Sequence, residues 1–406
     1  MSAKVQEYDV IIVGGGPVGL ALGASLVRFC DGLSVAICDR RPFAVPNDAR
    51  ASALAAGVTR VFEALGLWDE MAKTASPVNK MKITDSGSRD ISRPLFLAFE
   101  GDVVPGRPYA HLVPNKTTIG ALLEAVQDKV DLIAPIEIEA YEADNRSAKL
   151  RCADGRVLEA PLVIAADGAR SALRGMAGIG TIGHDYDQMG IVTTITHELD
   201  HENTAFEHFR PAGPFASLPL PGKQSSLVWT ERTADAQRLK ELPTKELEPL
   251  IEQAMGSALG KVTIKEQVQA FPLRLQISRE FIAPRLALVG DAAHVVHPIA
   301  GQGLNLGIKD VAVLAEIVIE AVRLGQDHGG ADVLENYQRL RRLDTALMAL
   351  ATDGLNKLFS NDIAPLRALR DIGLGMVDRM PPIKTGLIRH AASVTNGPRL
   401  MQGQAI

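Results

Sequence analysis

Apolar runs and amphipathic stretches alternate at the start of the chain. Tyr8–Val13 is apolar apart from Asp9, an amphipathic stretch continues to about Phe29, and a second apolar run covers Leu33–Cys38. Short runs without polar alternation are typical of strands buried on both faces of a parallel sheet. The pattern predicts a strand, a helix and a second strand, which together form the repeating unit of an α/β fold.

Later segments repeat this contrast. Two further apolar runs, Pro161–Ala166 and Leu286–Val289, predict buried strands. Segments rich in alanine, leucine and valine predict helices: Ala51–Leu65, Asn115–Val126 with Asn115 as candidate N-cap, and the stretch from about Gly307 onward. Between Tyr141 and Leu150 no alternation of apolar and polar residues is visible, so no strand is predicted there.

The chain changes character between Gly190 and about Val268. Short alternating segments predict antiparallel strands, and a charged stretch after them predicts a helical insert: Ile191–Thr196, Thr204–Phe209, Ser217–Leu220 and Ser226–Thr230, then Thr233–Gly260. We therefore expect a discontinuous Rossmann-like domain (residues 1–76, 100–182 and 270–340). An inserted, mostly antiparallel β-sheet domain (77–99 and 183–269) and a C-terminal helical region (341–406) complete the predicted architecture.

Composition narrows the class of protein. Hydrophobic residues make up 46% and charged residues 22% of the 406 positions, as in an ordinary globular protein. The net charge of −5 argues against a nucleic-acid binder, which normally carries a basic surface. Three cysteines without a CxxC pair predict neither a disulfide scaffold nor a metal site, and they fit a reduced, cytoplasmic compartment. The polar N-terminus predicts no secretory signal, and no apolar run reaches the ~18 residues of a membrane span.

A glycine fingerprint follows the first predicted strand. Gly14, Gly16 and Gly19 have the spacing GxGxxG and open the helix, and Asp39 ends the second strand 20 residues after Gly19. In this setting the glycines allow a tight turn, admit a pyrophosphate and let the helix pack on the strand, while the acid binds ribose hydroxyls. A second match, Gly178–Gly183, lacks a preceding strand and is followed by one, so we interpret it as a turn.

Two other loops follow predicted strands. Asp167-Gly168 comes directly after one apolar run, and Gly290-Asp291 comes after another. The second loop continues through Pro298 into a glycine-rich helix start, where backbone N–H groups can approach a planar or anionic ligand. On spacing alone the alternatives stay open: a plain turn for the first loop, and a surface loop ahead of a core helix for the second.

Three motifs in this order carry a resemblance to a known family. Gly14–Gly19, Ala165–Ser171 and Val289–His294 resemble the signatures of the class A FAD-dependent aromatic hydroxylases. Four further segments are most similar to the hydroxylases of ubiquinone biosynthesis: His294–Gly307, Gly213–Leu220, Phe271–Leu273 and Tyr337–Arg342. The resemblance covers nearly the whole chain. It implies an FAD-binding domain of the glutathione-reductase type and a sheet domain that covers the substrate.

The resemblance also implies the chemistry. FAD would be reduced by NAD(P)H, which docks transiently because no second nicotinamide-binding βαβ unit is apparent. O2 would then give a flavin C4a-hydroperoxide that hydroxylates the ring of a phenolic ubiquinone precursor. The prenyl chain of that substrate is implied by the subgroup alone. The protein must keep the intermediate dry, which an apolar pocket under the sheet domain can do.

Site residues are carried over from the matching motifs. Asp39 would bind the adenosine ribose, Asp291 the ribityl chain or the pyrophosphate end, and Arg50 the flavin-side phosphates unless it is a solvated surface residue. The expected cofactor-binding set is Gly14, Gly16, Pro17, Val18, Gly19, Asp39, Arg40, Arg50, Asn115, Asp167, Gly290, Asp291, Pro298, Gly301, Gly303, Leu304 and Asn305. Pro298, Gly301 and Gln302 would wall the peroxide side. Ahead of Asn115 the chain has His-Leu-Val-Pro, where the family more often carries an acid.

Several alternatives stay open at this stage. His294 and His297 are expected to be hydrogen-bonded structural residues rather than a proton relay. Residues 357–400 carry more basic than acidic side chains, which indicates a solvated helical surface or a docking face for a membrane or another quinone-biosynthesis protein. Other functions include a prenyl reductase, an epoxidase and a non-catalytic flavoprotein scaffold, and the oligomeric state is left open.

Overall fold

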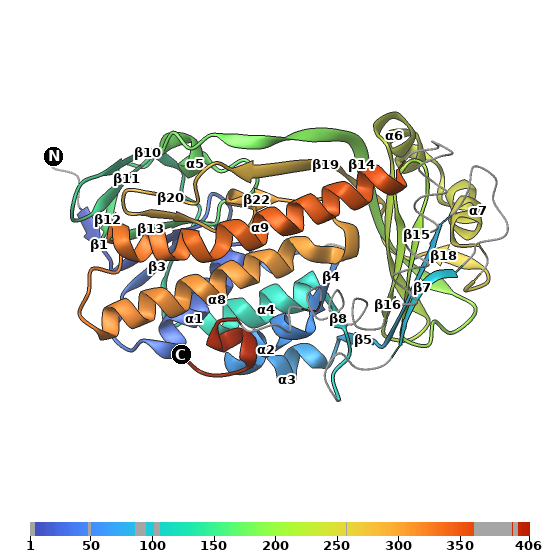
Figure 1. The fold of residues 1–406 in the computed structure, drawn as a ribbon, viewed down its shortest axis with the longest axis horizontal. Helices are drawn as coiled ribbons and strands as arrows, with labels where there is room; N and C mark the ends of the chain where they lie inside the picture. Colours follow the sequence, from blue (N-terminus) through green and yellow to red (C-terminus); the bar gives the residue numbers. More distant parts are fainter. Residues whose placement is uncertain are drawn as a thin grey trace.

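The computed structural model describes residues 5–47, 50–85, 95–100, 106–256, 258–360, 392 and 397–406. A parallel sheet with helices on its faces occupies one side of the molecule, and a large, mostly antiparallel sheet stands at the other (Figure 1). This α/β architecture is the predicted fold class. The positions of the domain boundaries stay a prediction.

The parallel sheet is built from the predicted apolar runs. Its strand order is β20-β21-β13-β2-β3-β9, and every neighbouring pair is parallel except β20 with β21. The strands are β2 (Val10–Val13), β3 (Val35–Cys38), β9 (Asp131–Ile133), β13 (Leu162–Ala165), β20 (Ile282–Ala283) and β21 (Leu286–Leu288). Residues of β2, β3, β13 and β21 are buried throughout, as strands covered on both faces must be.

Helices cover this sheet and form one core with it. They are α1 (Pro17–Phe29), α4 (Asn115–Val126), α8 (Gln302–Arg323) and α9 (Ala331–Phe359), and α8 and α9 run side by side across the front of Figure 1. The hydroxyl of Tyr337 on α9 donates to the carbonyl of Leu288 at 2.7 Å, which ties the outer helix to the sheet. None of the described helices is long and apolar enough to cross a membrane.

A smaller sheet corrects one prediction. It has the order β1-β12-β11-β10, with β1 (Val5–Glu7), β10 (Ile138–Ala143), β11 (Ala148–Cys152) and β12 (Val157–Ala160). The expectation of no strand between Tyr141 and Leu150 was wrong. In β11 the buried positions are Ala148, Leu150 and Cys152, with Lys and Arg between them, so the alternation is real but spans only five residues.

The antiparallel strands expected after Gly190 are confirmed. The large sheet has the order β22-β19-β14-β17-β16-β15-β6-β7, with β18 paired to β14, and only β15 with β6 is parallel. Its strands are β6 (Lys80–Asp85), β7 (Leu95–Glu100), β14 (Thr181–His197), β15 (Thr204–Phe209), β16 (Phe215–Leu220), β17 (Gln224–Arg232), β18 (Val262–Ile264), β19 (Gln269–Ser278) and β22 (His294–Val295). The helical insert forms α6 (Thr233–Glu241) and α7 (Thr244–Met255), which pack on one face of the sheet through a separate apolar core.

Two helix starts differ from expectation. Ala51–Leu65 was predicted as one helix, but β4 (Ala51–Ala55) pairs with β8 (Ala110–Pro114), and the helix α2 covers only Ala56–Ala64. Strand pairing here overrides the helix propensity of alanine. A short strand, β5 (Ser76–Val78), completes that sheet, and α3 (Trp68–Ala72) follows α2. Helix α8 begins at Gln302 rather than near Gly307, so its glycines lie in the first turns.

Candidate active site

The three motif loops meet at one edge of the parallel sheet. Because β3, β2, β13 and β21 are parallel neighbours, the loops after them emerge together. Backbone hydrogen bonds connect them: Ala166 N–H donates to Val13 at 2.8 Å, and Val289 N–H donates to Ala165 at 3.0 Å. Segments more than 120 residues apart in the sequence therefore form one site.

Glycine is required where these loops touch. A Cβ on Gly14, whose φ is 124°, would lie 2.1 Å from the carbonyl oxygen of Ala166, and one on Gly19 would lie 2.0 Å from the carbonyl oxygen of Gly14. Gly16 differs, because a Cβ there would meet nothing within 4 Å. Gly16 is the N-cap of α1, where Pro17 and Val18 follow in the first turn, so an anion can reach the helix N-terminus.

Asp39 stands at the end of β3 beside this loop. Its carboxylate accepts hydrogen bonds from the backbone N–H of Gly15 at 2.7 Å and of Arg41 at 2.8 Å. The carboxylate therefore lies next to the glycine turn, as the spacing predicted. Arg40 is exposed at the same strand end.

Asp167 has one oxygen engaged and one without a partner. Oδ2 accepts from the N–H groups of Ala172 (2.8 Å) and Leu173 (3.3 Å) at the start of α5 (Ala172–Met176). Oδ1 is buried and has no hydrogen-bond partner. A buried carboxylate oxygen without a donor is costly, which points to a ligand group that donates to it.

The third loop is held by a buried ionic network on Asp310 of α8. Its carboxylate accepts from Gly290 N–H (2.8 Å), His294 Nε2 (2.7 Å) and Arg341 Nε (2.6 Å). Burial disfavours ionisation of Asp310, but the charges and hydrogen bonds of His294 and Arg341 outweigh it and lower the pKa of the carboxyl. His294 is thus a hydrogen-bonded structural residue, as expected.

Asp291 projects from the short 3₁₀ turn η1 (Gly290–Ala292). Its side chain reaches solvent. Partial loss of solvation nevertheless raises its pKa, and the nearby His294 opposes this shift. Gly290 (φ 58°) approaches Val18 of α1, since a Cβ on it would lie 3.1 Å from the valine side chain. The first and third motifs are therefore in contact.

Arg174 links the second loop to the third. Its guanidinium donates to the carbonyls of Ala292 (2.8 Å) and Ala169 (2.9 Å). Arg174 and Asp310 are positioning residues that the sequence reasoning missed. The available signals were an acid inside the apolar helix that contains Asp310, and an arginine three residues after Ser171.

The loop after β22 leads into the start of α8. Pro298 precedes the 3₁₀ turn η2 (Ile299–Gly301), and Gly301 adopts φ 63° as the N-cap of α8. The side chain of Asn305 accepts from Ala55 N–H (2.9 Å) and donates to the carbonyls of Ala53 (2.8 Å) and Gly301 (3.0 Å). It therefore fixes the loop against β4.

The first turn of α8 offers room and donors. A Cβ on Gly303 would meet nothing within 4 Å. The first N–H groups of a helix have no acceptor within the helix, and in α8 these groups extend to Leu304. Gln302 is buried at the same turn. An electronegative ligand edge can therefore approach this helix end.

Arg50 and Asn115 lie near each other at the β4–β8 pair. Asn115 N–H donates to the carbonyl of Arg50 at 2.9 Å, and Asn115 Oδ1 accepts from Ser52 Oγ at 2.8 Å. The prediction that Asn115 is an N-cap was wrong, because Pro114 occupies that position and α4 has no side-chain cap. The guanidinium of Arg50 lies 5.4 Å from the ring centroid of Phe271, so it reaches the large sheet.

His297 does not fit the expected hydrogen-bonded role. It is fully buried, and neither ring nitrogen has a hydrogen-bond partner. Its ring meets that of Tyr186 edge-on at 5.0 Å, and the Tyr186 hydroxyl donates to Asp353 of α9 at 3.1 Å. Burial lowers the pKa of His297 to about 4, so the imidazole is neutral at physiological pH.

The second glycine match is structural. Gly178 (φ 70°) lies in the turn after α5, and β14 follows from Thr181, so no helix begins there, as predicted. Gly183 lies within β14, where a Cβ would be 1.9 Å from the carbonyl oxygen of Leu275. This glycine serves strand packing.

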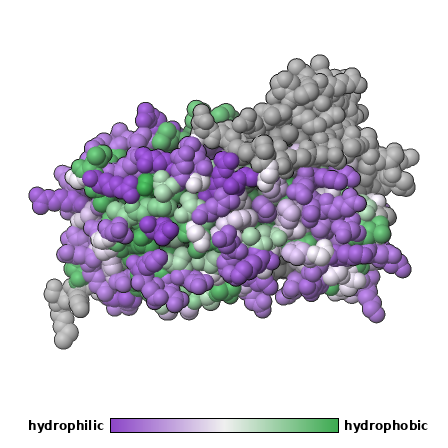
Figure 2. All heavy atoms as spheres, turned by 90° about the horizontal axis from the view of Figure 1, so that it is seen from below, coloured by the Kyte–Doolittle hydropathy of each residue, from purple (hydrophilic) through white to green (hydrophobic). Residues whose placement is uncertain are grey.

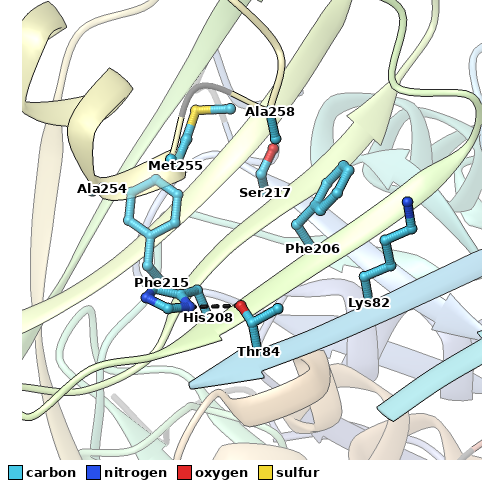
Figure 3. A pocket seen from close by; sticks show the side chains of 10 residues that line it. Lys82, Thr84, Phe206, His208, Phe215, Ser217, Ala254, Met255 and Ala258 are labelled. Carbon is cyan, nitrogen blue, oxygen red and sulfur yellow. Dashed lines mark hydrogen bonds between the residues drawn. The ribbon is translucent and has the colours of Figure 1, made fainter. Parts of the chain in front are cut away.

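A cavity of about 150 Å³ is separate from the motif loops (Figure 3). It lies between the large sheet and the C-terminal end of α7, and Phe206, His208 and Phe215 point into it. The next residue of β15, Phe209, points to the other face, where it packs with Ile299 of the Pro298 loop. The sheet therefore separates this cavity from the candidate site.

These features fit a dinucleotide. The open position at Gly16 suits a pyrophosphate, the carboxylates of Asp39 and Asp291 suit sugar or ribityl hydroxyls, and the unpartnered oxygen of Asp167 requires a donor. The open turn at Gly303 suits an electronegative ring edge.

Comparisons with known proteins indicate the same cofactor. The family model described as FAD binding domain matches residues 7–350. The chain is 41% identical over 405 residues to ubiquinone hydroxylase UbiL of Rhodospirillum rubrum, covering 97% of this chain and 92% of that one. It is 32% identical over 394 residues to 3-demethoxyubiquinol 3-hydroxylase of Escherichia coli, covering 95% and 98%.

Two solved structures share the fold. The p-nitrophenol 4-monooxygenase PnpA of Pseudomonas putida matches with a TM-score of 0.79 at 19% identity, covering 96% of this chain and 99% of that one. PqsL of Pseudomonas aeruginosa, solved with 2-aminobenzoylacetate, matches with a TM-score of 0.78 at 24% identity, covering 91% and 99%. With the loop geometry and the match across most of its length, the chain belongs to the FAD binding domain family and takes FAD as its cofactor.

Proposed function

We propose that this chain is an FAD-dependent monooxygenase that hydroxylates the aromatic ring of a prenylated phenolic ubiquinone precursor, using NAD(P)H and O2. One observation carries the proposal. The three glycine–aspartate loops converge at one sheet edge in a chain that matches a named ubiquinone hydroxylase at 41% identity over nearly its full length. FAD, when bound, supplies the redox and oxygen chemistry.

Different residues would bind different parts of the cofactor. Asp39 would hold the adenosine ribose and Gly16 would admit the pyrophosphate to the N-terminus of α1, because both lie at the same turn. Asp291 would bind the ribityl chain or the pyrophosphate end. Arg50, which extends to Phe271 on the large sheet, would contact the flavin-side phosphates or move with the ring.

The start of α8 would face the flavin's pyrimidine edge. N–H groups from Gly303 to Asn305 lie at a helix N-terminus and would stabilise negative charge on the ring. Pro298, Gly301 and Gln302 would wall the reacting face. Close to them, Ile299 packs with Phe209 and Phe359, and this apolar cluster would exclude water.

We also propose where the enzyme works. A prenylated substrate is a lipid, so the chain would act at the cytoplasmic face of a membrane, beside other proteins of quinone biosynthesis. The basic residues 357–400, considered as a docking face, lie mostly outside the described residues.

The test uses the purified, yellow protein and a short-chain prenylphenol. We expect NAD(P)H oxidation and O2 uptake that depend on the phenol, with one atom of isotopically labelled O2 appearing on the ring. A label on the prenyl chain would identify an epoxidase, and a reduced prenyl chain without label would identify a reductase. Bound FAD with no turnover on any phenol would favour a scaffold. In cells, deletion of the gene should accumulate a quinone precursor that lacks one oxygen.

A further inference from the structure

The outward face of α9 is unusually apolar for a surface helix. Leu340, Leu343, Leu347, Leu350 and Leu355 are 50%, 68%, 53%, 68% and 38% exposed. The first four recur at intervals of three and four residues, so they form one stripe along the helix. In Figure 1 this helix crosses the front of the molecule, with no described element in front of it.

Charges around the stripe are mostly cationic. Between Arg339 and Lys357 the exposed positions of α9 carry no carboxylate. Arg339 bonds to neutral Asn336, Arg342 pairs with Glu280 of the neighbouring loop, and Lys357 pairs with Asp353 at the far end. Asp344 is turned inward to Arg341 and Lys309. The stripe is therefore flanked by Arg339 and by two ion pairs, which leaves a small excess of positive charge beside the leucines. Exposed leucines beside a positive excess suit a helix that lies on an anionic lipid surface.

The exposed area of the leucine stripe argues against a second copy of this chain as the main partner that covers it. The leucines expose a few hundred Å², the size of the largest apolar patches on monomers. A stable protein complex buries about 800 Å² on each partner, more than this one helix face supplies. On the underside, hydrophobic patches lie among hydrophilic residues (Figure 2).

The same helix leads to the candidate active site. Beyond Leu355, Phe359 at the end of α9 stacks on Phe209 with ring centroids 4.1 Å apart, and both pack with Ile299 of the Pro298 loop. The leucine stripe and this buried apolar cluster thus lie on the same helix, and the cluster ends at the loop that would face the flavin. A lipid substrate held in a bilayer would meet the exposed leucines first and the buried cluster afterwards.

We propose that the leucine stripe of α9 lies on an anionic membrane surface, from which the enzyme takes its prenylated substrate toward the Phe209–Phe359 cluster. The choice of a lipid substrate rests on the proposed function. Contact between the stripe and the bilayer does not require turnover, so it can be measured separately.

The experiment is flotation of the full-length, FAD-loaded protein with vesicles of phosphatidylcholine, with and without phosphatidylglycerol. We expect wild type to float with anionic vesicles, less so at high salt. Leu343→Gln/Leu350→Gln should reduce the bound fraction at least tenfold. The matched control is Leu199→Gln, which changes a 51% exposed leucine in the turn after β14 and should bind like wild type.

Separate measurements report whether the variants fold and whether they are active. All variants should keep the wild-type far-UV spectrum and FAD content, because the changed side chains are exposed. Activity on a water-soluble phenol should also persist in the double variant, and its absence in every protein would count against the proposed function alone. The membrane proposal is overturned if wild type does not float, or if the double variant floats equally well. It is also overturned if wild type is a dimer that the double variant dissociates without any vesicle binding.

Discussion

His297 should make the folded protein sensitive to acid. Its side chain is fully buried, both ring nitrogens lack partners, and burial lowers its pKa from 6.5 to about 4 although the carboxylate of Asp353 opposes the shift. The aromatic group against it is Tyr186 of β14. Protonation in this setting would place an unpaired cation in the protein interior, which is strongly unfavourable.

The sign and size of this loss of stability in acid follow from the pKa of His297 in the folded and in the unfolded state. In the unfolded chain the imidazole keeps a pKa near 6.5, so the unfolded state binds the proton more tightly. The contribution of neutral His297 to stability is complete above about pH 6.5 and is lost as the pH falls toward about 4. Linkage gives a loss of about 2 kcal/mol between pH 7 and pH 5, from a total of about 3 kcal/mol.

Urea unfolding at pH 7 and pH 5 measures this loss. His297→Leu keeps a similar volume without titratable atoms, so its free energy of unfolding should fall by about 2 kcal/mol less than that of wild type over this interval. Tyr186→Phe is the control, because it keeps the ring that packs on His297 and should retain the wild-type difference. Equal pH dependence in wild type and His297→Leu would refute the reasoning.

Three further changes test the site. Asp310→Asn leaves the buried Arg341 without its main counterion and should lower the free energy of unfolding in urea by about 3–5 kcal/mol, part of which the added change Arg341→Met should recover. No effect of Asp310→Asn on stability would show that the network is not ionic. Asp291→Ala should purify with less flavin per protein than wild type or Asp200→Ala, an exposed control, and full flavin occupancy would remove Asp291 from the site. Gly14→Ala should reduce the yield of soluble, flavin-bound protein, because its Cβ would overlap Ala166. The control Gly32→Ala lies in open space at a φ of 82°, so it should lower stability by only about 1 kcal/mol and retain flavin.

The sequence predicted the parts of the site that depend on local backbone chemistry. Gly14, Gly19 and Gly290 are needed because other backbone or side-chain atoms come too close for a Cβ, and such positions leave a visible pattern. The apolar strands were equally clear, because burial on both faces removes every polar residue. Convergence of the loops then follows from parallel strand order.

What failed depended on contacts between distant segments. Ala51–Ala55 becomes a strand only because β8 pairs with it, and nothing local indicates that. Asp310 and Arg174 were missed as positioning residues, since the loops that they hold lie far away in the sequence: His294 is 16 residues from Asp310, and Ala292 is 118 residues from Arg174. His297 was expected to be hydrogen-bonded like His294, and only the packed structure distinguishes the two.

The ion pair between Asp310 and Arg341 limits how this enzyme can be recombined with its relatives. The acid belongs to α8 and its counterion to α9, and the acid also holds the loop that carries Asp291. In a chimera whose crossover lies between the two helices, the acid comes from one parent protein and its counterion from the other. Only exchanges that move residues 290–341 as one block keep both halves of the pair, so crossover points for domain shuffling should lie outside that block.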